Sequence, residues 1–130
     1  MSSPLPELPT QAVDATRILV VDDDEAVRAV LVDVLEDEGF EVVGGARDGL
    51  EGVSLALALT PDVVLLDVRM PRLDGIGAAR QIRAELPAAR LVMLSAYDEQ
   101  ALRTEANEAG ASAFLVKGCP LGEIVRAVAA

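Results

Sequence analysis

Four apolar segments of this chain each end, on their carboxyl side, in residues that can bind a phosphate or a metal ion. These residues are the pair Asp22-Asp23, Asp67, Ser95 and Lys117, which follow residues 18–21, 63–66, 91–94 and 114–116. Carboxylates in one cluster repel one another unless a cation lies among them, and Mg²⁺ prefers oxygen ligands of this kind. A hydroxyl and an ammonium group supply donors for the oxygens of an anion. The combination predicts phosphoryl transfer at a magnesium site.

Each of these residues has an expected role in that chemistry. A carboxylate that attacks phosphorus forms an acyl phosphate, and Asp67, alone at the end of its segment, is our candidate nucleophile. Asp23 and Asp67 are the expected direct ligands of Mg²⁺, with Asp22 holding a coordinated water. Lys117 is expected on the side of the anion opposite the metal ion, and Ser95 can donate a hydrogen bond to the new phosphoryl oxygens.

The elements that must position these residues are buried strands. Continuous β-branched and aliphatic runs are typical of strands covered on both faces, as in a parallel sheet between layers of helices. In such a sheet the carboxyl ends of the strands lie along one edge, and ligands bind there. Helical patterns alternate with the strands to the end of the chain. The pattern predicts a doubly wound α/β fold with five strands and five helices.

Helix boundaries are marked by capping residues and by glycine or proline. Asp24 can cap the first helix, Asp74 can cap the third, and Asp98 begins the fourth. A short second strand over residues 40–43, ending in two glycines, is placed at the edge of the sheet because no chemical group follows it. Apolar residues at helical spacing indicate the five helices, and in the third of these Ile76, Ala79, Ile82 and Leu86 are expected to face inward. The apolar positions of the other four helices are Val27, Val30, Leu31, Val34 and Leu35; Leu50, Val53 and Leu57; Ala101, Leu102, Ala106 and Ala109; and Ile124, Val125 and Val128.

Two further features concern the organisation of the chain. The second helix has an alternative, because Leu55, Leu57 and Leu59 also alternate as in a strand, but the spacing between neighbouring strands favours a helix. Residues 1–16 contain three prolines and no periodicity, which predicts a disordered leader before a single domain over residues 17–130. The last helix runs to the end without a polar tail, so we expect a domain cut from a longer protein.

The composition of the chain argues against several classes of partner and indicates a location. The formal net charge of −11 argues against direct nucleic-acid binding, because a duplex would repel the chain. No segment approaches the eighteen apolar residues of a membrane span, and no membrane association is expected. The single cysteine, Cys119, cannot form a disulfide within the chain, which favours a reduced thiol and a cytoplasmic location.

The motifs around these residues resemble the receiver domain of bacterial response regulators, over about residues 17–130. The matching motifs are Val-Val-Asp22-Asp23-Asp24, Leu-Leu-Asp67 with Met70-Pro71 and Asp74-Gly75 after it, Leu-Ser95-Ala96, and Phe114-x-x-Lys117. The resemblance implies a flavodoxin-like sheet of strand order 2-1-3-4-5. It also implies a phospho-acceptor rather than a conventional enzyme. Asp67 would take phosphate from a sensor histidine kinase, with Mg²⁺ at Asp22, Asp23, Asp67 and the Arg69 carbonyl.

The same resemblance implies how phosphorylation is read out. Ser95 and Phe114 would form a switch that rearranges the face built by the fourth helix, the fifth strand and the fifth helix. Phenylalanine replaces the more frequent tyrosine at residue 114 and so lacks its hydroxyl. Arg69 and Tyr97 would flank the path of the hydrolytic water and slow the loss of phosphate.

The resemblance also suggests partners beyond the kinase. Gly118-Cys119 separates Lys117 from Pro120, a longer joint that is frequent in receivers linked to LuxR-type helix-turn-helix domains. We therefore expect a C-terminal DNA-binding output domain or an effector protein as the target of the signal. Homodimerisation that depends on phosphorylation is a further expectation.

Four other readings compete with this one. A phosphatase of the haloacid dehalogenase class would use Asp22 in Asp22-x-Asp24 as its nucleophile, but Ala26 stands where Thr or Val is expected. A flavodoxin-like electron carrier needs aromatic residues around a flavin, and only two per cent of the chain is aromatic. A nucleotide-binding protein would need a Gly-rich loop ending in Lys-Ser or Lys-Thr. A receiver that acts without phosphorylation is hard to reconcile with the complete set of site residues.

Overall fold

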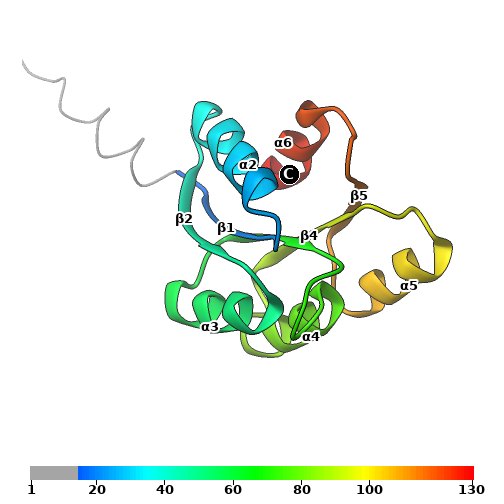
Figure 1. The fold of residues 1–130 in the computed structure, drawn as a ribbon. Coiled ribbons are helices and arrows are strands. Elements are labelled where there is room, and N and C mark those ends of the chain that lie inside the picture. Colours follow the sequence, from blue (N-terminus) through cyan, green and yellow to red (C-terminus); the bar gives the residue numbers. More distant parts are fainter. Residues whose placement is uncertain (1–14) are drawn as a thin grey trace, which may run out of the picture.

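The computed structural model describes residues 15–130, in which a central sheet is flanked by two layers of helices (Figure 1). The strands are β1 (Arg17–Val21), β2 (Glu41–Ala46), β3 (Val63–Asp67), β4 (Arg90–Ser95) and β5 (Ala113–Val116). The helices are α2 (Glu25–Asp37), α3 (Gly49–Leu59), α4 (Gly75–Glu85), α5 (Gln100–Glu108) and α6 (Leu121–Ala129). Most of the leader expected over residues 1–16 lies outside the described residues, and residues 15 and 16 precede β1 without regular secondary structure.

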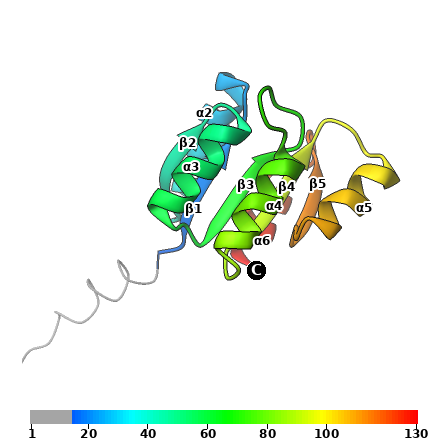
Figure 2. The same cartoon turned by 90° about the horizontal axis from the view of Figure 1, so that it is seen from below.

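The sheet has the order β2-β1-β3-β4-β5, and every neighbouring pair is parallel (Figures 1 and 2). This confirms the expected flavodoxin-like order 2-1-3-4-5 and the position of β2 at one edge. Helices α2 and α6 cover one face of the sheet, and α3, α4 and α5 cover the other. Both faces of the central strands are therefore buried, as their continuous apolar sequences predict.

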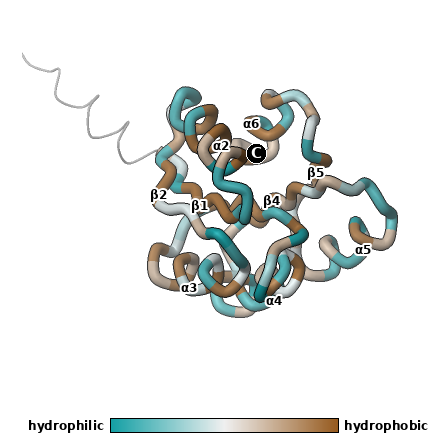
Figure 3. Tube along the Cα trace, in the orientation of Figure 1, coloured by the Kyte–Doolittle hydropathy of each residue, from teal (hydrophilic) through white to brown (hydrophobic). Residues whose placement is uncertain are grey.

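Alternate residues of each strand enter two separate cores. In β1, Leu19 and Val21 join the core beneath α3, α4 and α5, whereas Ile18 and Val20 join the core beneath α2 and α6. All five residues of β3 are buried. In Figure 3 the tube along β1 and β4 is mostly hydrophobic, which matches this two-sided burial. The strands are thus held rigidly up to the residues that follow them.

Three helices begin at an aspartate whose side chain accepts hydrogen bonds from the first turn. Asp24, Asp48 and Asp74 cap α2, α3 and α4, which confirms the expected caps at residues 24 and 74. Helices α5 and α6 have no such side-chain cap among the described residues. In the same range, 15–130, no helix is long and apolar enough to cross a membrane.

Several of the apolar residues that indicated helices are exposed to solvent. Val30, Leu50 and Leu57 are 52%, 45% and 42% exposed, although the helices that their spacing indicated are present. In α3 the inward positions are taken by small residues, and a β-carbon on Gly52 would lie only 3.0 Å from Val21 Cγ1. The helix packs too closely on the sheet for a large side chain at that position.

Two boundaries also differ from expectation. Strand β2 continues through its glycines to Ala46 rather than ending at residue 43. Helix α5 begins at Gln100 rather than Asp98, and Ala101 is exposed. Asp98 instead accepts a hydrogen bond from Arg103 Nε at 2.6 Å. Its carboxylate is engaged with a side chain and does not cap the helix.

Candidate functional site

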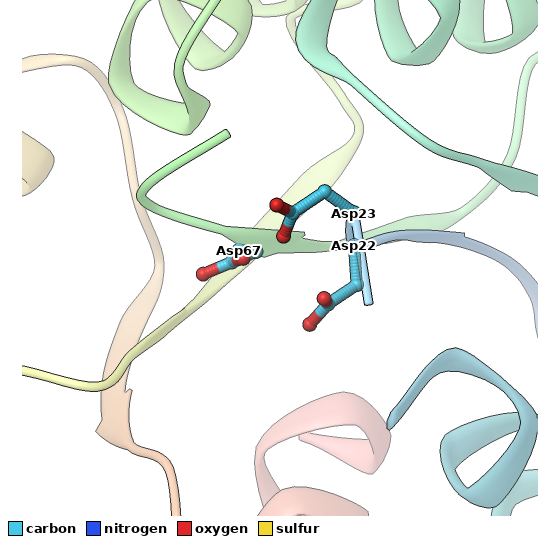
Figure 4. Close-up of side chains that lie close together, drawn as sticks. All are labelled: Asp22, Asp23 and Asp67. Carbon is cyan, nitrogen blue, oxygen red and sulfur yellow. The ribbon is translucent and has the colours of Figure 1, made fainter. Parts of the chain in front are cut away.

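The residues that could do chemistry follow four adjacent strands of the sheet. Asp22 comes directly after β1, Asp67 is the last residue of β3, Ser95 is the last residue of β4, and Lys117 comes directly after β5. The carboxylates of Asp22, Asp23 and Asp67 offer oxygen atoms that all lie within 4.8 Å of one another (Figure 4). The structure therefore brings the predicted acidic cluster together at the carboxyl edge of the sheet.

Asp22 is held in place by hydrogen bonds from the N-cap residue and the first turn of α2. Its Oδ1 accepts a hydrogen bond from the Asp24 amide at 2.9 Å, and its carbonyl accepts one from Arg28 Nη1 at 2.7 Å. The residue is 1% exposed. Its Oδ2 is buried and accepts no well-aligned hydrogen bond from the described part of the chain, although it lies 2.9 Å from Lys117 Nζ. A buried carboxylate oxygen favours a cation beside it, and the ammonium group of Lys117 is such a cation.

Lys117 bridges two of the carboxylates. Its Nζ lies 2.9 Å from Asp22 Oδ2 and 3.3 Å from Asp67 Oδ2. Its backbone amide donates to the Ser95 carbonyl at 2.7 Å, and Gly118 follows with φ of +95°. A left-handed residue directly after Lys117 turns the chain toward α6 and favours glycine there. The lysine is thus the cation that partly neutralises the acidic cluster.

The charges of this cluster shift its protonation equilibria. Burial, reinforced by the negative charge of Asp22 and opposed by Lys117, raises the pKa of Asp67 from 3.8 to about 6. Burial by itself would lower the pKa of Lys117, but the contacts with Asp22 and Asp67 outweigh it and the pKa is raised. Lys117 is therefore charged at neutral pH, and Asp67 is an ionised but poorly compensated carboxylate.

The segment after Asp67 returns closely to β3. The Gly75 amide donates to the Val68 carbonyl at 2.7 Å, and a β-carbon on residue 75 would lie only 2.1 Å from the Asp67 carbonyl oxygen. Only glycine fits at this position without displacing the backbone of the strand. The start of α4 is thereby fixed directly against the residue that carries the candidate nucleophile.

Ser95 is fully buried at the end of β4. Its Oγ accepts a hydrogen bond from the Tyr97 amide at 2.9 Å, which leaves the hydroxyl hydrogen available for another acceptor. Arg69 lies above this segment, with its Cζ 5.4 Å from the centre of the Tyr97 ring and its Nη2 3.9 Å from Glu99 Oε1. Arg69 and Tyr97 were both expected beside the path of the hydrolytic water. The two side chains lie together at the surface.

Phe114 lies on β5, half-buried against the core beneath α3, α4 and α5. The guanidinium of Arg103 covers its ring, with Cζ 4.8 Å from the ring centre. Sequence reasoning missed Arg28, Glu99 and Arg103. No residue pattern in a sequence indicates a contact between a helix and a distant strand. Only the ion pair of Arg103 could have been suspected, because Asp98 precedes Arg103 by five residues.

The acidic cluster fits a hard divalent cation. Asp22, Asp23 and Asp67 offer carboxylate oxygens, the ligands that Mg²⁺ prefers, and the single positive charge of Lys117 balances these carboxylates only in part. Asp23 is exposed, which leaves an open side for water and for a phosphate-bearing partner. The three side chains belong to two adjacent strand ends, so the cluster exists without any rearrangement of the fold.

A comparison with protein families matches residues 18–129 to the family described as the response regulator receiver domain. Among curated proteins, the chain is 42% identical over 123 residues to the transcriptional regulatory protein PdtaR of Mycobacterium tuberculosis. That match covers 92% of this chain and 60% of PdtaR, so the chain spans less than two thirds of this relative.

Two solved structures show the same fold. The signal receiver domain of a protein described as the response regulator NarL from Mycobacterium tuberculosis superposes with a TM-score of 0.84 at 41% identity, covering 88% of this chain and 94% of that one. A chain from the CheX–CheY–BeF₃–Mg²⁺ complex of Borrelia burgdorferi gives a TM-score of 0.83 at 30% identity, covering 87% and 86%. The likeness extends over nearly all the residues described here.

Proposed function

Because the chain belongs to the response regulator receiver family, we propose that it is a phospho-acceptor that carries the signal of a sensor histidine kinase on Asp67. The observation that supports this most is the position of Lys117, whose Nζ lies within 3.3 Å of both Asp22 and Asp67 at the open edge of the sheet. A fixed positive charge beside a buried carboxylate favours the arrival of a second anion at that carboxylate.

The side chains present can perform the transfer. An ionised Asp67 oxygen attacks the phosphorus of a phosphohistidine, the new P–O bond forms as the P–N bond breaks, and histidine leaves. Since the pKa of Asp67 is about 6, most of the carboxylate is ionised at neutral pH. Lys117 stabilises the added negative charge, and Ser95 donates its free hydroxyl hydrogen to a phosphoryl oxygen. The same side chains would support phosphorylation by small phosphodonors, and they would also support self-dephosphorylation at a slow rate.

Asp22, Asp23, Asp67 and the Arg69 carbonyl are the proposed ligands of Mg²⁺. When bound, Mg²⁺ would supply positive charge beside the phosphoryl oxygens. The solved Borrelia burgdorferi complex names BeF₃ and Mg²⁺ together with a chain of similar fold, which supports this choice of ion. The residue types predict that Asp22 holds a coordinated water of the ion, and Mg²⁺ affinity in Asp22→Asn would distinguish this from direct contact.

Phosphorylation would be read at the face formed by α5, β5 and α6. Ser95 is expected to turn toward the phosphoryl group, and Phe114 to occupy the space that it leaves. This face would then contact a C-terminal DNA-binding output domain, an effector protein or a second copy of the chain. Similarity to the transcriptional regulatory protein PdtaR supports an output in gene regulation. We place this activity in the cytoplasm, where a kinase could deliver the phosphoryl group.

A groove of about 340 Å³ beside the site suits the docking of the phosphohistidine-bearing domain. It lies between α2 and the turn before α6, and its lining includes Val27, Leu31, Lys117 and Cys119. Val30 and Leu121, on its two sides, are 52% and 45% exposed. An apolar surface of this kind next to the catalytic lysine would hold a partner helix while its histidine reaches Asp67.

Arg69 and Tyr97 are proposed to set the lifetime of the phosphoryl group. Their contact at 5.4 Å, together with the ion pair between Arg69 and Glu99, supports a cover over the approach of water to Asp67. Replacing both with alanine should speed dephosphorylation, and an unchanged decay rate would contradict this role.

The test of the proposed function is direct labelling. The chain is incubated with acetyl phosphate and Mg²⁺, and its intact mass should increase by one phosphoryl group. Asp67→Asn should not be labelled, whereas Asp33→Asn, which alters an exposed aspartate on α2, should be labelled like the unchanged chain. Borohydride reduction of the acyl phosphate followed by peptide mass spectrometry locates the modified residue. Modification at Asp22 would instead favour the phosphatase alternative, which the family match does not support.

A further inference from the structure

One arginine on α5 contacts two other parts of the phosphorylation-responsive face. Arg103 Nε donates to Asp98 Oδ1 at 2.6 Å, and Arg103 Cζ lies 4.8 Å from the centre of the Phe114 ring. Asp98 belongs to the segment between β4 and α5, and Phe114 to β5. The hydrogen bond from Arg103 lowers the pKa of Asp98, so the pair is charged at neutral pH. One side chain therefore connects three separate elements, and we call this set the Arg103 clamp.

The start of α5 has little else to hold it. The helix buries only Leu102 and Ala106 among its own residues, and its N-terminal capping residue, Glu99, makes no side-chain capping hydrogen bond in the described chain. Residues 96–100 are all exposed. In Figures 1 and 2, α5 lies at the edge of the molecule beside β5. A segment with so few buried apolar contacts is easily displaced, so contacts made by Arg103 matter more here than on a well-buried helix.

Phe114 and Ser95 belong to the same face of the sheet. Phe114 pairs with Met93 in the register of β4 and β5, and both pack in the core beneath α3, α4 and α5. Side chains alternate along a strand, so Ser95 projects to the same face as Met93. The ring that Arg103 covers therefore lies on the face toward which Ser95 projects, and Asp98 follows Ser95 by three residues.

We infer that Arg103, oriented by Asp98, is a positioning residue that keeps Phe114 and the start of α5 in their present arrangement until Asp67 is phosphorylated. This inference rests on the proposed function and deepens it. Ser95 Oγ now accepts a hydrogen bond from the Tyr97 amide at 2.9 Å. When the hydroxyl turns toward a phosphoryl oxygen, the segment that contains Asp98 moves with it. The guanidinium then loses the carboxylate that orients it, and the ring of Phe114 is released.

The clamp predicts an effect on binding rather than on folding. Arg103 and Asp98 have side chains that are 39% and 57% exposed, and an exposed ion pair adds little to global stability. The clamp is inferred to favour the present arrangement over the phosphorylated one by some factor in the equilibrium between them. Removing the clamp must then strengthen, by that factor, the binding of any ligand that selects the phosphorylated arrangement.

Beryllofluoride, an anion that mimics a phosphoryl group on a carboxylate, is the probe. Its affinity in Mg²⁺ is measured on the 130-residue chain through the fluorescence of Tyr97, the single tyrosine in a chain without tryptophan. Arg103→Ala should bind about three- to tenfold more tightly, the range that one cation–π contact and one exposed ion pair allow. Asp98→Ala should also bind more tightly, but it should add nothing when combined with Arg103→Ala. Arg80→Ala, which alters an exposed arginine on α4, is the control and should bind like the unchanged chain.

A second measurement follows the ring itself. The chain contains two phenylalanines, Phe40 and Phe114, so fluorophenylalanine labelling gives two ¹⁹F signals. Without beryllofluoride, Arg103→Ala should shift the Phe114 signal and leave that of Phe40 unchanged. Equal affinities in Arg103→Ala and Arg80→Ala, or independent effects of the Asp98 and Arg103 substitutions, would refute the clamp. Failure of every variant and of the unchanged chain to bind beryllofluoride would refute the proposed function instead.

Discussion

The backbone of Gly75 approaches that of Asp67 so closely that a β-carbon on residue 75 would lie 2.1 Å from the Asp67 carbonyl oxygen. The contact joins the first residue of α4 to the last residue of β3. It fixes the loop between them at both ends and therefore restricts the surroundings of the proposed nucleophile.

Gly75→Ala should destabilise the chain by at least about 2 kcal/mol, because an overpacked backbone must move to admit the methyl group. It should also slow labelling by acetyl phosphate. Gly122→Ala is the matched control, since a β-carbon there meets nothing closer than Arg126 Nη1 at 3.6 Å. Urea unfolding gives both free energies, and equal values for the two variants would show that the loop adapts without cost.

Lys117→Ala should separate two properties of the site. Without the ammonium group, the acidic cluster can still bind Mg²⁺, and Mg²⁺ should raise the melting temperature of the variant at least as much as that of the unchanged chain. Phosphorylation by acetyl phosphate should nevertheless slow by about tenfold or more, because a charge directed at the phosphoryl group is lost. Normal labelling rates in Lys117→Ala would remove the lysine from the mechanism.

Asp67→Asn should stabilise the chain at neutral pH in the presence of a chelator. The pKa of Asp67 is about 6 in the folded chain against a usual 3.8, so the folded state binds the proton more tightly. The stability linked to this proton is complete below about pH 4 and is lost as the pH rises through about 6. Asparagine stays neutral, and the variant should gain up to about 3 kcal/mol at neutral pH and nothing at about pH 4. Unfolding free energies at several pH values, with Asp33→Asn as control, measure the difference; a gain that does not change with pH would contradict the shifted pKa.

Arg83→Ala should destabilise the side of the domain opposite the site. Its guanidinium donates to the carbonyls of Pro87 and Ala89 at 2.7 and 2.6 Å, and to that of Gly110 at 2.8 Å. Loss of hydrogen bonds to these carbonyls should cost about 1–3 kcal/mol. Arg80→Ala, three residues earlier on the exposed side of α4, should cost little. Comparable losses in the two variants would mean that the carbonyl contacts contribute nothing specific.

Much of the fold follows from local patterns in the sequence. The apolar runs that became β1, β3 and β4 are buried on both faces, and the run that became the edge strand β5 is half-buried. Such runs are hard to explain in any other element. The caps at Asp24 and Asp74 were also predictable, because an aspartate before a helical pattern has few other local roles. Strand order came from resemblance to a family and not from the patterns themselves.

The sequence does not show which face of a helix is buried where the packing distance decides it. Leu50 and Leu57 have helical spacing and strong hydrophobicity, yet Gly52 and Ala56 face the sheet because α3 lies close to β1. Hydrophobic periodicity treats glycine as neutral and therefore selects the wrong face. Contacts such as Arg103 with Phe114 could not be predicted, because they depend on the placement of two elements in space.

The four groups proposed to handle the phosphoryl anion are attached at the ends of four adjacent strands of the sheet. Residues 96–100, which follow Ser95, are in contrast exposed and contribute little to the core. Substitutions in this exposed segment cost little free energy of folding. The lifetime of the phosphoryl group and the choice of partner can therefore change while the phosphoryl-transfer chemistry stays the same. One sheet can in this way serve many separate signalling routes, which differ only in the exposed residues around its carboxyl edge.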